Sequence, residues 1–65
     1  MTRYEADALI ERVVAVAGDP EAGHMMADNV VHAILVAIAS GQGDPRELAE
    51  AGLRVYAATE KRWFA

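Results

Sequence analysis

The tripeptide Gly18-Asp19-Pro20 recurs as Gly43-Asp44-Pro45, and the two copies divide the chain of 65 residues into three segments. Glycine adopts the left-handed conformation that ends many helices, aspartate caps the next helix, and proline suits a first turn because its missing N–H needs no partner there. Each tripeptide therefore predicts the end of one helix and the start of another. We expect an all-α fold in a single domain, residues 1–65, with helices over about 3–17, 20–40 and 45–62.

The first and third segments carry further helix signals. Thr2 and Glu5 form a Thr-x-x-Glu capping box, and Glu47 follows Asp44 at the same spacing. The third helix should present an apolar face that includes Tyr56 and Gly52. Because a glycine inside a helix costs about 1 kcal/mol relative to alanine, we expect close helix packing at Gly52.

The middle segment is apolar on nearly every side. Residues 33–39 read Ala-Ile-Leu-Val-Ala-Ile-Ala and contain no polar side chain. A helix of this kind has to be covered all round, which two short helices can hardly achieve. We therefore expect a helical-bundle homodimer or larger homo-oligomer. The predicted interface residues are Val30, Ile34, Leu35, Val36, Ile38, Leu53 and Phe64.

Size and composition favour the same interpretation. A domain this small buries only about 60% of its unfolded surface, so a lone core is marginal, and disulfides, metals, partners or good helix packing compensate for it. The chain has no cysteine, which excludes disulfides and thiolate metal sites. Its hydrophobic fraction of 54% exceeds the usual share of about 45–50%, and this excess favours oligomerisation.

Charge and hydropathy bear on possible partners and on localisation. The net charge of −4 opposes binding to nucleic acids and anionic membranes. A helix-turn-helix made by the second and third helices would place Arg46 beside Glu47 and Glu50, and the two acids oppose phosphates. No signal peptide is visible, and the apolar run is shorter than the roughly 20 residues that span a bilayer. We expect a cytoplasmic protein that binds neither nucleic acid nor membrane.

One constellation could carry chemistry. His24, Asp28 and His32 are spaced by four, so they form a row on one stripe of the second helix, with Glu21 one turn before His24. Imidazole and carboxylate at this spacing can bind a divalent metal such as zinc. The row spans about 12 Å, so a single ion could use only two of its members and would need a second chain. The interpretation that we favour is that Asp28 forms a hydrogen bond or an ion pair with one or both histidines. In that case we expect no cofactor.

Catalytic chemistry has little support elsewhere in the chain. Without cysteine, the hydroxyl nucleophiles besides tyrosine are Thr2, Ser40 and Thr59, and no histidine–acid pair is placed beside Ser40. The segment 41–43 lacks the lysine and the third glycine of a phosphate-binding loop. We predict no catalytic residue.

Two resemblances accompany these patterns. The chain resembles a group of small helical proteins of bacteria and their phages, a group that implies no activity. The shared residues are Gly18-Asp19-Pro20-Glu21-Ala22, His24, Asp28, Ile34-Leu35, Ala37-Ile38-Ala39, Gly41, Asp44-Pro45, Leu48-Ala49 and Arg62-Trp63-Phe64-Ala65. Residues 27–36 are similar to a helix of the all-α nucleotide pyrophosphohydrolases, whose Glu-x-x-Asp helps bind magnesium. Asp28 matches that aspartate, whereas Met25 replaces the glutamate.

These observations favour a non-enzymatic protein-interaction or regulatory protein that acts as a homo-oligomer with an unidentified protein partner, and the first resemblance implies that it is encoded by a phage or prophage. The alternative is a metal-binding helical protein, or a degenerate or minimal metal-dependent hydrolase, that uses His24, Asp28 and His32.

Overall fold

The computed structural model confirms an all-helical fold. Its helices are α1 (Arg3–Val16), α2 (Pro20–Ala39) and α3 (Pro45–Trp63), and each predicted boundary lies within one residue of the observed one. The structure describes the backbone of residues 1–63 and the side chains of residues 1–59.

Side-chain caps explain where each helix begins. The backbone N–H of Glu5 donates to Thr2 Oγ1 at 3.1 Å, and the backbone N–H of Thr2 donates to Glu5 Oε1 at 2.8 Å. Oδ1 of Asp19 accepts hydrogen bonds from two backbone N–H groups in the first turn of α2, at 3.1 and 3.2 Å. Oδ1 of Asp44 does the same for α3, at 2.9 and 3.2 Å. Both aspartates therefore act as the N-caps that the repeated tripeptide predicts.

The two tripeptides differ in how they end the preceding helix. Gly43 has a φ of +103° and Gly41 a φ of +71°, so the turn between α2 and α3 uses left-handed backbone. Gly18 does not have a positive φ, and the helix before it ends on Ala17 in a right-handed conformation. The prediction of a left-handed helix end was therefore wrong at Gly18. There α1 closes through a hydrogen bond from the backbone N–H of Asp19 to Val16 at 3.0 Å.

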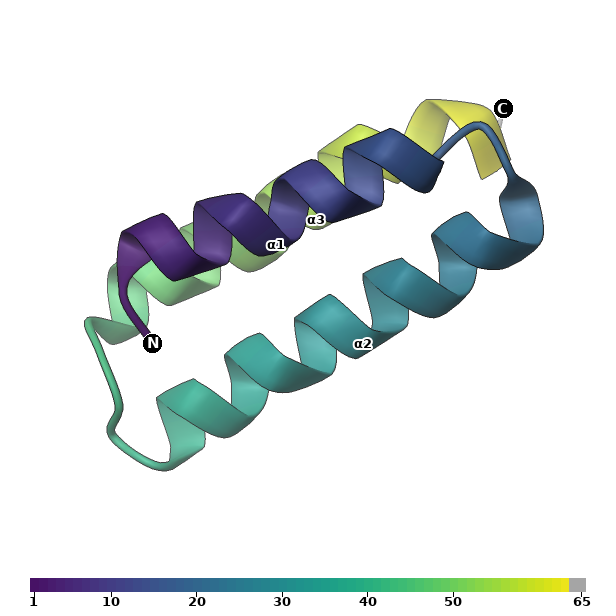
Figure 1. The fold of residues 1–65 in the computed structure, drawn as a ribbon. Helices are drawn as coiled ribbons and strands as arrows, with labels where there is room; N and C mark the ends of the chain where they lie inside the picture. The colour runs from purple at the N-terminus through teal and green to yellow at the C-terminus, as the bar shows by residue number, and fades with distance from the viewer. Residues whose placement is uncertain (64–65) are drawn as a thin grey trace.

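The helices run up, down and up as a three-helix bundle (Figure 1). Helices α1 and α3 lie side by side in the same direction, and α2 runs antiparallel to both. Each helix contacts the other two, and the molecule measures 33 × 17 × 16 Å.

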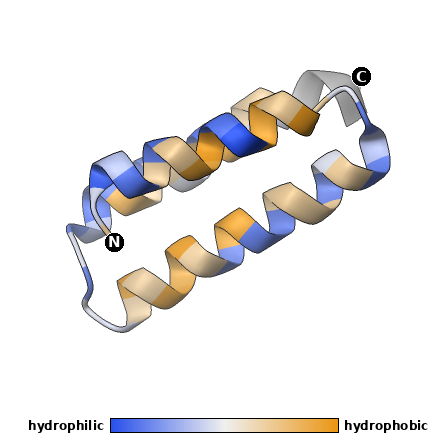
Figure 2. Ribbon diagram, viewed as in Figure 1, coloured by the Kyte–Doolittle hydropathy of each residue, from blue (hydrophilic) through white to orange (hydrophobic). Residues whose placement is uncertain are grey.

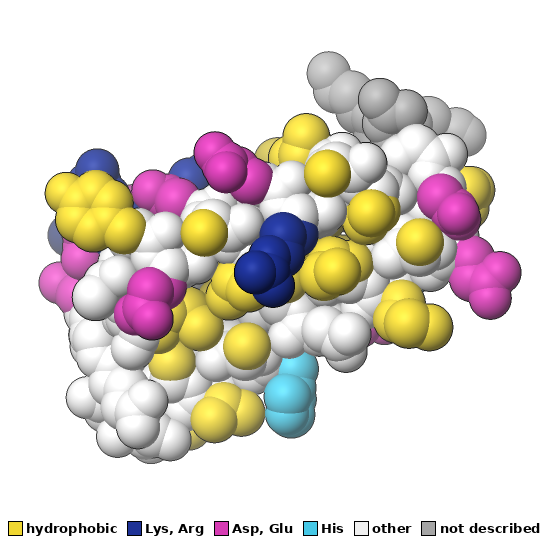
Figure 3. Space-filling model, viewed as in Figure 1, with side chains coloured by type: hydrophobic (Ala, Val, Ile, Leu, Met, Phe, Trp, Pro, Cys, Tyr) yellow, Lys and Arg dark blue, Asp and Glu magenta, His cyan; other side chains and the backbone are white. Residues whose placement is uncertain are grey.

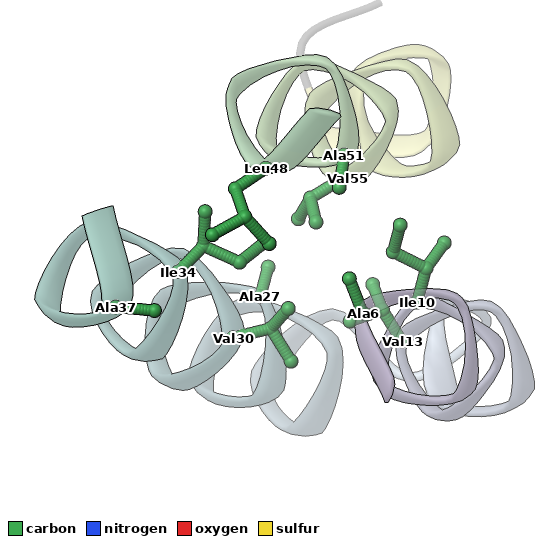
Figure 4. Packing of buried hydrophobic residues seen from close by; sticks show 10 residues of the cluster. All are labelled: Ala6, Ile10, Val13, Ala27, Val30, Ile34, Ala37, Leu48, Ala51 and Val55. Atoms are coloured by element: carbon green, nitrogen blue, oxygen red, sulfur yellow. The ribbon is translucent and has the colours of Figure 1, made fainter. Parts of the chain in front are cut away.

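The core lies along the axis between the three helices (Figure 4). It is made of small and medium-sized apolar side chains, and five of the eleven buried hydrophobic residues among residues 1–59 are alanine. Its continuous cluster consists of Ala6, Ile10, Val13, Ala27, Val30, Ile34, Ala37, Leu48, Ala51 and Val55. The hydroxyl of Thr59 is also buried, and it donates to the Val55 carbonyl at 3.1 Å, so its polarity is satisfied.

Helices α1 and α3 cover only one side of α2. Within the apolar run 33–39, Ile34 and Ala37 are buried, whereas Leu35 and Val36 remain 57% and 50% exposed. Figure 2 shows hydrophobic residues along most of the C-terminal half of this helix. The bundle therefore leaves a large part of the apolar surface of α2 in contact with solvent.

Candidate functional site

Among the described side chains, large hydrophobic residues are as common on the surface as in the core. Six of them are buried, namely Ile10, Val13, Val30, Ile34, Leu48 and Val55. Seven are exposed, namely Tyr4, Val14, Met25, Leu35, Val36, Leu53 and Tyr56. Hydrophobic side chains are visible over much of the face formed by α1 and α2 (Figure 3). Single exposed apolar residues are common on protein surfaces, whereas contiguous apolar patches mark interaction surfaces. The positions of the exposed residues relative to one another therefore decide whether they form an interaction surface.

Three of the seven exposed large hydrophobic residues come together in a groove between α2 and α3. The groove has a volume of about 240 Å³, and no charged side chain lies in its lining among the described residues. Its rim is formed by Leu35, Leu53 and Tyr56, which are 57%, 69% and 56% exposed. The described lining residues are Val31, Ile34, Leu35, Ile38, Ala49, Gly52, Leu53 and Tyr56. We call this surface the α2/α3 groove.

Helix α3 contributes to the groove through a second apolar stripe. The first stripe, Leu48, Ala51 and Val55, is buried in the core. The second stripe, Ala49, Gly52, Leu53 and Tyr56, repeats at three and four residues and lines the groove. This spacing puts its members on one face of a helix. Helix α3 is therefore apolar on two adjacent faces, and the protomer covers only one of them.

Gly52 lies in the middle of the second stripe and has open space above it. Apart from its chain neighbours and the backbone of its own helix, a Cβ atom built on Gly52 would meet no atom of the described residues within 4 Å. The expected close packing at Gly52 is therefore absent within the protomer. The glycine still costs helix α3 about 1 kcal/mol relative to alanine.

The predicted interface residues fall into three groups. Val30 and Ile34 are each only 2% exposed, because they belong to the protomer's own core and leave almost no surface for a second copy. Leu35, Val36 and Leu53 are exposed, and Ile38 is half-buried beside the core. Phe64 lies outside the described residues. Tyr56 was expected on the core face of α3, but it is exposed; the spacing from Ala49 to Tyr56 was the signal for a second face.

The row of His24, Asp28 and His32 lies on the exposed side of α2, and Glu21 is also exposed. A histidine side chain projects from the edge of the molecule in Figure 3. Within the part of the chain whose side chains are described, no three His, Asp or Glu residues come close enough together to hold a metal ion. Metal binding by two of these residues together with a second chain stays a prediction.

A second, polar groove runs between α1 and α3. It has a volume of about 260 Å³ and is lined by Arg3, Asp7, Glu47, Glu50 and Arg54. Nη2 of Arg54 lies 2.6 Å from Oδ1 of Asp7, across the two helices. Acidic and basic side chains are mixed in this lining, and the paired Arg54 and Asp7 side chains are 51% and 38% exposed, so the groove presents no surface of a single charge.

A third opening lies beside the turn that follows α2. It has a volume of about 370 Å³ and is lined by residues from both chain segments that meet there, namely Met1, Thr2, Arg3, Tyr4, Gly43, Asp44, Glu47 and Leu48. The Met1 carbonyl oxygen lies so close to Gly43 that a Cβ atom on that residue would clash with it. The opening therefore results from the packing of residues 1–4 against residues 43–48. Its described lining brings together no cluster of catalytic or metal-binding side chains.

By length and composition alone, α2 could also cross a membrane. It has 20 residues, with a mean hydropathy of 1.4 and 28% burial over the qualifying window. The central helix of a soluble bundle passes the same test, so this property is weak evidence. The expectation that the apolar run is too short to span a bilayer was based on residues 33–39 and not on the whole of α2.

Comparison of the chain with protein-family models, with curated proteins and with solved structures found no match.

Proposed function

We propose that this chain is a small non-enzymatic protein that acts by binding proteins, and that it works as a homo-oligomer with a further protein partner. The observation that carries this proposal is the distribution of large hydrophobic side chains, six buried and seven exposed among the described residues. Burial of apolar surface contributes about 25 cal/mol per Å², so the exposed set is a substantial source of binding free energy.

The small protomer core gives the same proposal a thermodynamic basis. Five of the eleven buried hydrophobic residues that the structure describes are alanines, which bury little area each. Domains of this size are marginally stable alone, and association stabilises the folded state by mass action. Self-association would therefore extend the core of the bundle and raise its stability at the same time.

The charge distribution supports a protein partner over a nucleic acid. Arg46, near the start of α3, lies 3.7 Å from Glu50 and is thereby partly neutralised. Arg54 pairs with Asp7. With a net charge of −4 and these pairs in place, the chain offers no basic face among its described residues to a phosphate backbone. We accordingly propose a cytoplasmic protein that acts without a nucleic acid or a membrane.

Native mass spectrometry and sedimentation velocity test the proposal directly. The protein is purified without a chelator or an affinity metal and studied over a wide range of concentration. We expect dimers or larger species that dissociate on dilution and carry no bound metal. A monomer at every concentration would contradict the homo-oligomer, and a dimer would direct the search for the further partner to pull-down experiments with the dimeric form.

A further inference from the structure

We propose that the α2/α3 groove is the surface through which a second copy of this chain docks, with α3 of each copy crossing α3 of the other at Gly52. This inference rests on the homo-oligomer proposed above and identifies its contact surface. Three features of the groove support it.

The first feature is the second apolar stripe of α3. Residues at three- and four-residue spacing form the surface that one helix presents to another. The stripe of Ala49, Gly52, Leu53 and Tyr56 has this spacing over two turns but faces solvent in the protomer. A helix is the partner that such a stripe fits, and α3 of a second copy is a helix with the same stripe.

The second feature is Gly52. Small residues let helix backbones approach closely, but nothing in the protomer approaches this glycine within the reach of a Cβ atom. A partner helix crossing here would use the open space and would account for a residue that weakens α3 without serving the protomer. Ala49, one turn earlier, extends the shallow region for such a crossing.

The third feature is that the groove complements itself. In a two-fold symmetric dimer, the same patch meets its own copy, so it must supply both projections and hollows. Leu53 projects with 69% exposure, and Gly52 beside it leaves a hollow. The described lining of the groove carries no charge, so these residues would bring no like charges together between two copies of a chain whose net charge is −4.

The other exposed hydrophobic residues do not form a continuous apolar surface. Tyr4 and Val14 are ten residues apart on α1, which separates them by about 15 Å along the helix. Val36 and Met25 do not line the groove, and the exposed Asp28 and His32 lie between them in the sequence. The groove is therefore the surface we assign to the second copy.

Cysteine cross-linking tests the crossing point, because the chain has no cysteine of its own. A disulfide requires Cα atoms about 4.4–6.8 Å apart, so only residues near the two-fold axis can form one. We expect Gly52→Cys to yield a covalent dimer under mild oxidation, and Val14→Cys, at an exposed position of α1 outside the groove, to yield little. The proposal would be overturned if the Gly52→Cys variant sediments as a dimer but forms no disulfide. It would also be overturned if both variants cross-link equally.

A charge substitution provides an independent measurement. We expect Leu53→Glu to raise the dimer dissociation constant by at least about a hundredfold, because it would bury two carboxylates at the crossing. Val14→Glu introduces the same charge at an exposed hydrophobic residue of α1 and should alter the constant less than about threefold. If Val14→Glu dissociates the dimer, or Leu53→Glu does not, the groove is not the contact surface. If the unmodified chain is a monomer throughout, the homo-oligomer itself fails, which the mass alone reveals.

Discussion

Arg54 in α3 reaches across to Asp7 in α1, and its Nη2 atom lies 2.6 Å from Oδ1 of the carboxylate. The residues are 47 positions apart in the sequence, so this contact joins α1 to α3. The side chains are 51% and 38% exposed. Water and salt therefore weaken an attraction that would be strong in the protein interior.

We expect the Arg54–Asp7 pair to contribute about 0.2–1 kcal/mol to the free energy of unfolding. A double-mutant cycle with Arg54→Met and Asp7→Asn isolates this coupling, and high salt should reduce it. The exposed pair of Arg46 and Glu50, at 3.7 Å within one helix, serves as a comparison and should couple more weakly. A coupling above about 2 kcal/mol would mean that the pair is shielded from solvent, for example by a second copy.

Two leucines of α3 should respond differently to truncation. Leu48 is 1% exposed and Leu53 is 69% exposed. At a concentration where the chain is monomeric, we expect Leu48→Ala to lower the free energy of unfolding by about 2–5 kcal/mol and Leu53→Ala by less than about 0.5 kcal/mol. Urea unfolding followed by circular dichroism measures both changes. Similar losses for the two variants in the monomer would contradict the assignment of Leu53 to a surface that the protomer leaves uncovered.

The two tripeptides provide a matched pair of glycine substitutions. Gly43 has a φ of +103°, and a Cβ atom there would clash with the Met1 carbonyl oxygen. Gly18 has no positive φ, and a Cβ atom there meets nothing within 4 Å. We expect Gly43→Ala to cost at least about 1–3 kcal/mol, whereas Gly18→Ala should be neutral or stabilise by up to about 1 kcal/mol. Thermal unfolding measures the difference; equal effects would show that the two turns use the same backbone conformation.

The helix boundaries could be predicted from the sequence because their causes are local. A cap such as Asp19 or Asp44 acts on backbone N–H groups within three residues, so a short stretch of sequence contains all the required information. The same holds for the box of Thr2 and Glu5. The observed boundaries confirm these predictions.

The inward and outward faces could not be predicted in the same way. Helix α2 is apolar on several sides, so hydrophobicity alone does not say that Ile34 enters the core while Leu35 faces solvent. That choice depends on where α1 and α3 pack, which is a long-range property. Helix α3 has two adjacent apolar stripes, and for this reason Tyr56 and Gly52 were expected to pack inside the protomer.

The capping box at the start of α1 makes stability depend on pH. The Thr2 backbone N–H, and then the Thr2 side chain, donate hydrogen bonds to the Glu5 carboxylate and hold its pKa below the ordinary value of 4.5. Because the folded-state pKa lies below the unfolded one, this stabilisation is present at neutral pH and is lost as the pH falls through the folded-state pKa.

We therefore expect the unmodified chain to be more stable than Glu5→Gln at neutral pH, and the difference to shrink well below pH 4.5. Urea unfolding at a series of pH values measures it, and amide hydrogen exchange in the first turn of α1 locates it. A difference that persists unchanged into acid would show that the glutamine variant disturbs packing rather than the carboxylate's hydrogen bonds.

The row of His24, Asp28 and His32 gives a prediction about metal binding. The three residues are exposed on α2, and no group of three possible ligands converges among the described side chains. A structural zinc site uses four ligands, so one protomer supplies too few for tight binding. We expect the purified protein to carry no stoichiometric metal and added zinc to bind weakly in calorimetry.

His24→Ala and His32→Ala should then leave both the dimer mass and the unfolding midpoint nearly unchanged. A zinc ion that survives buffer exchange and is lost in either variant would mean that a second copy completes the site. Because the same ion could then activate a water molecule, an assay for metal-dependent hydrolysis would become the next experiment.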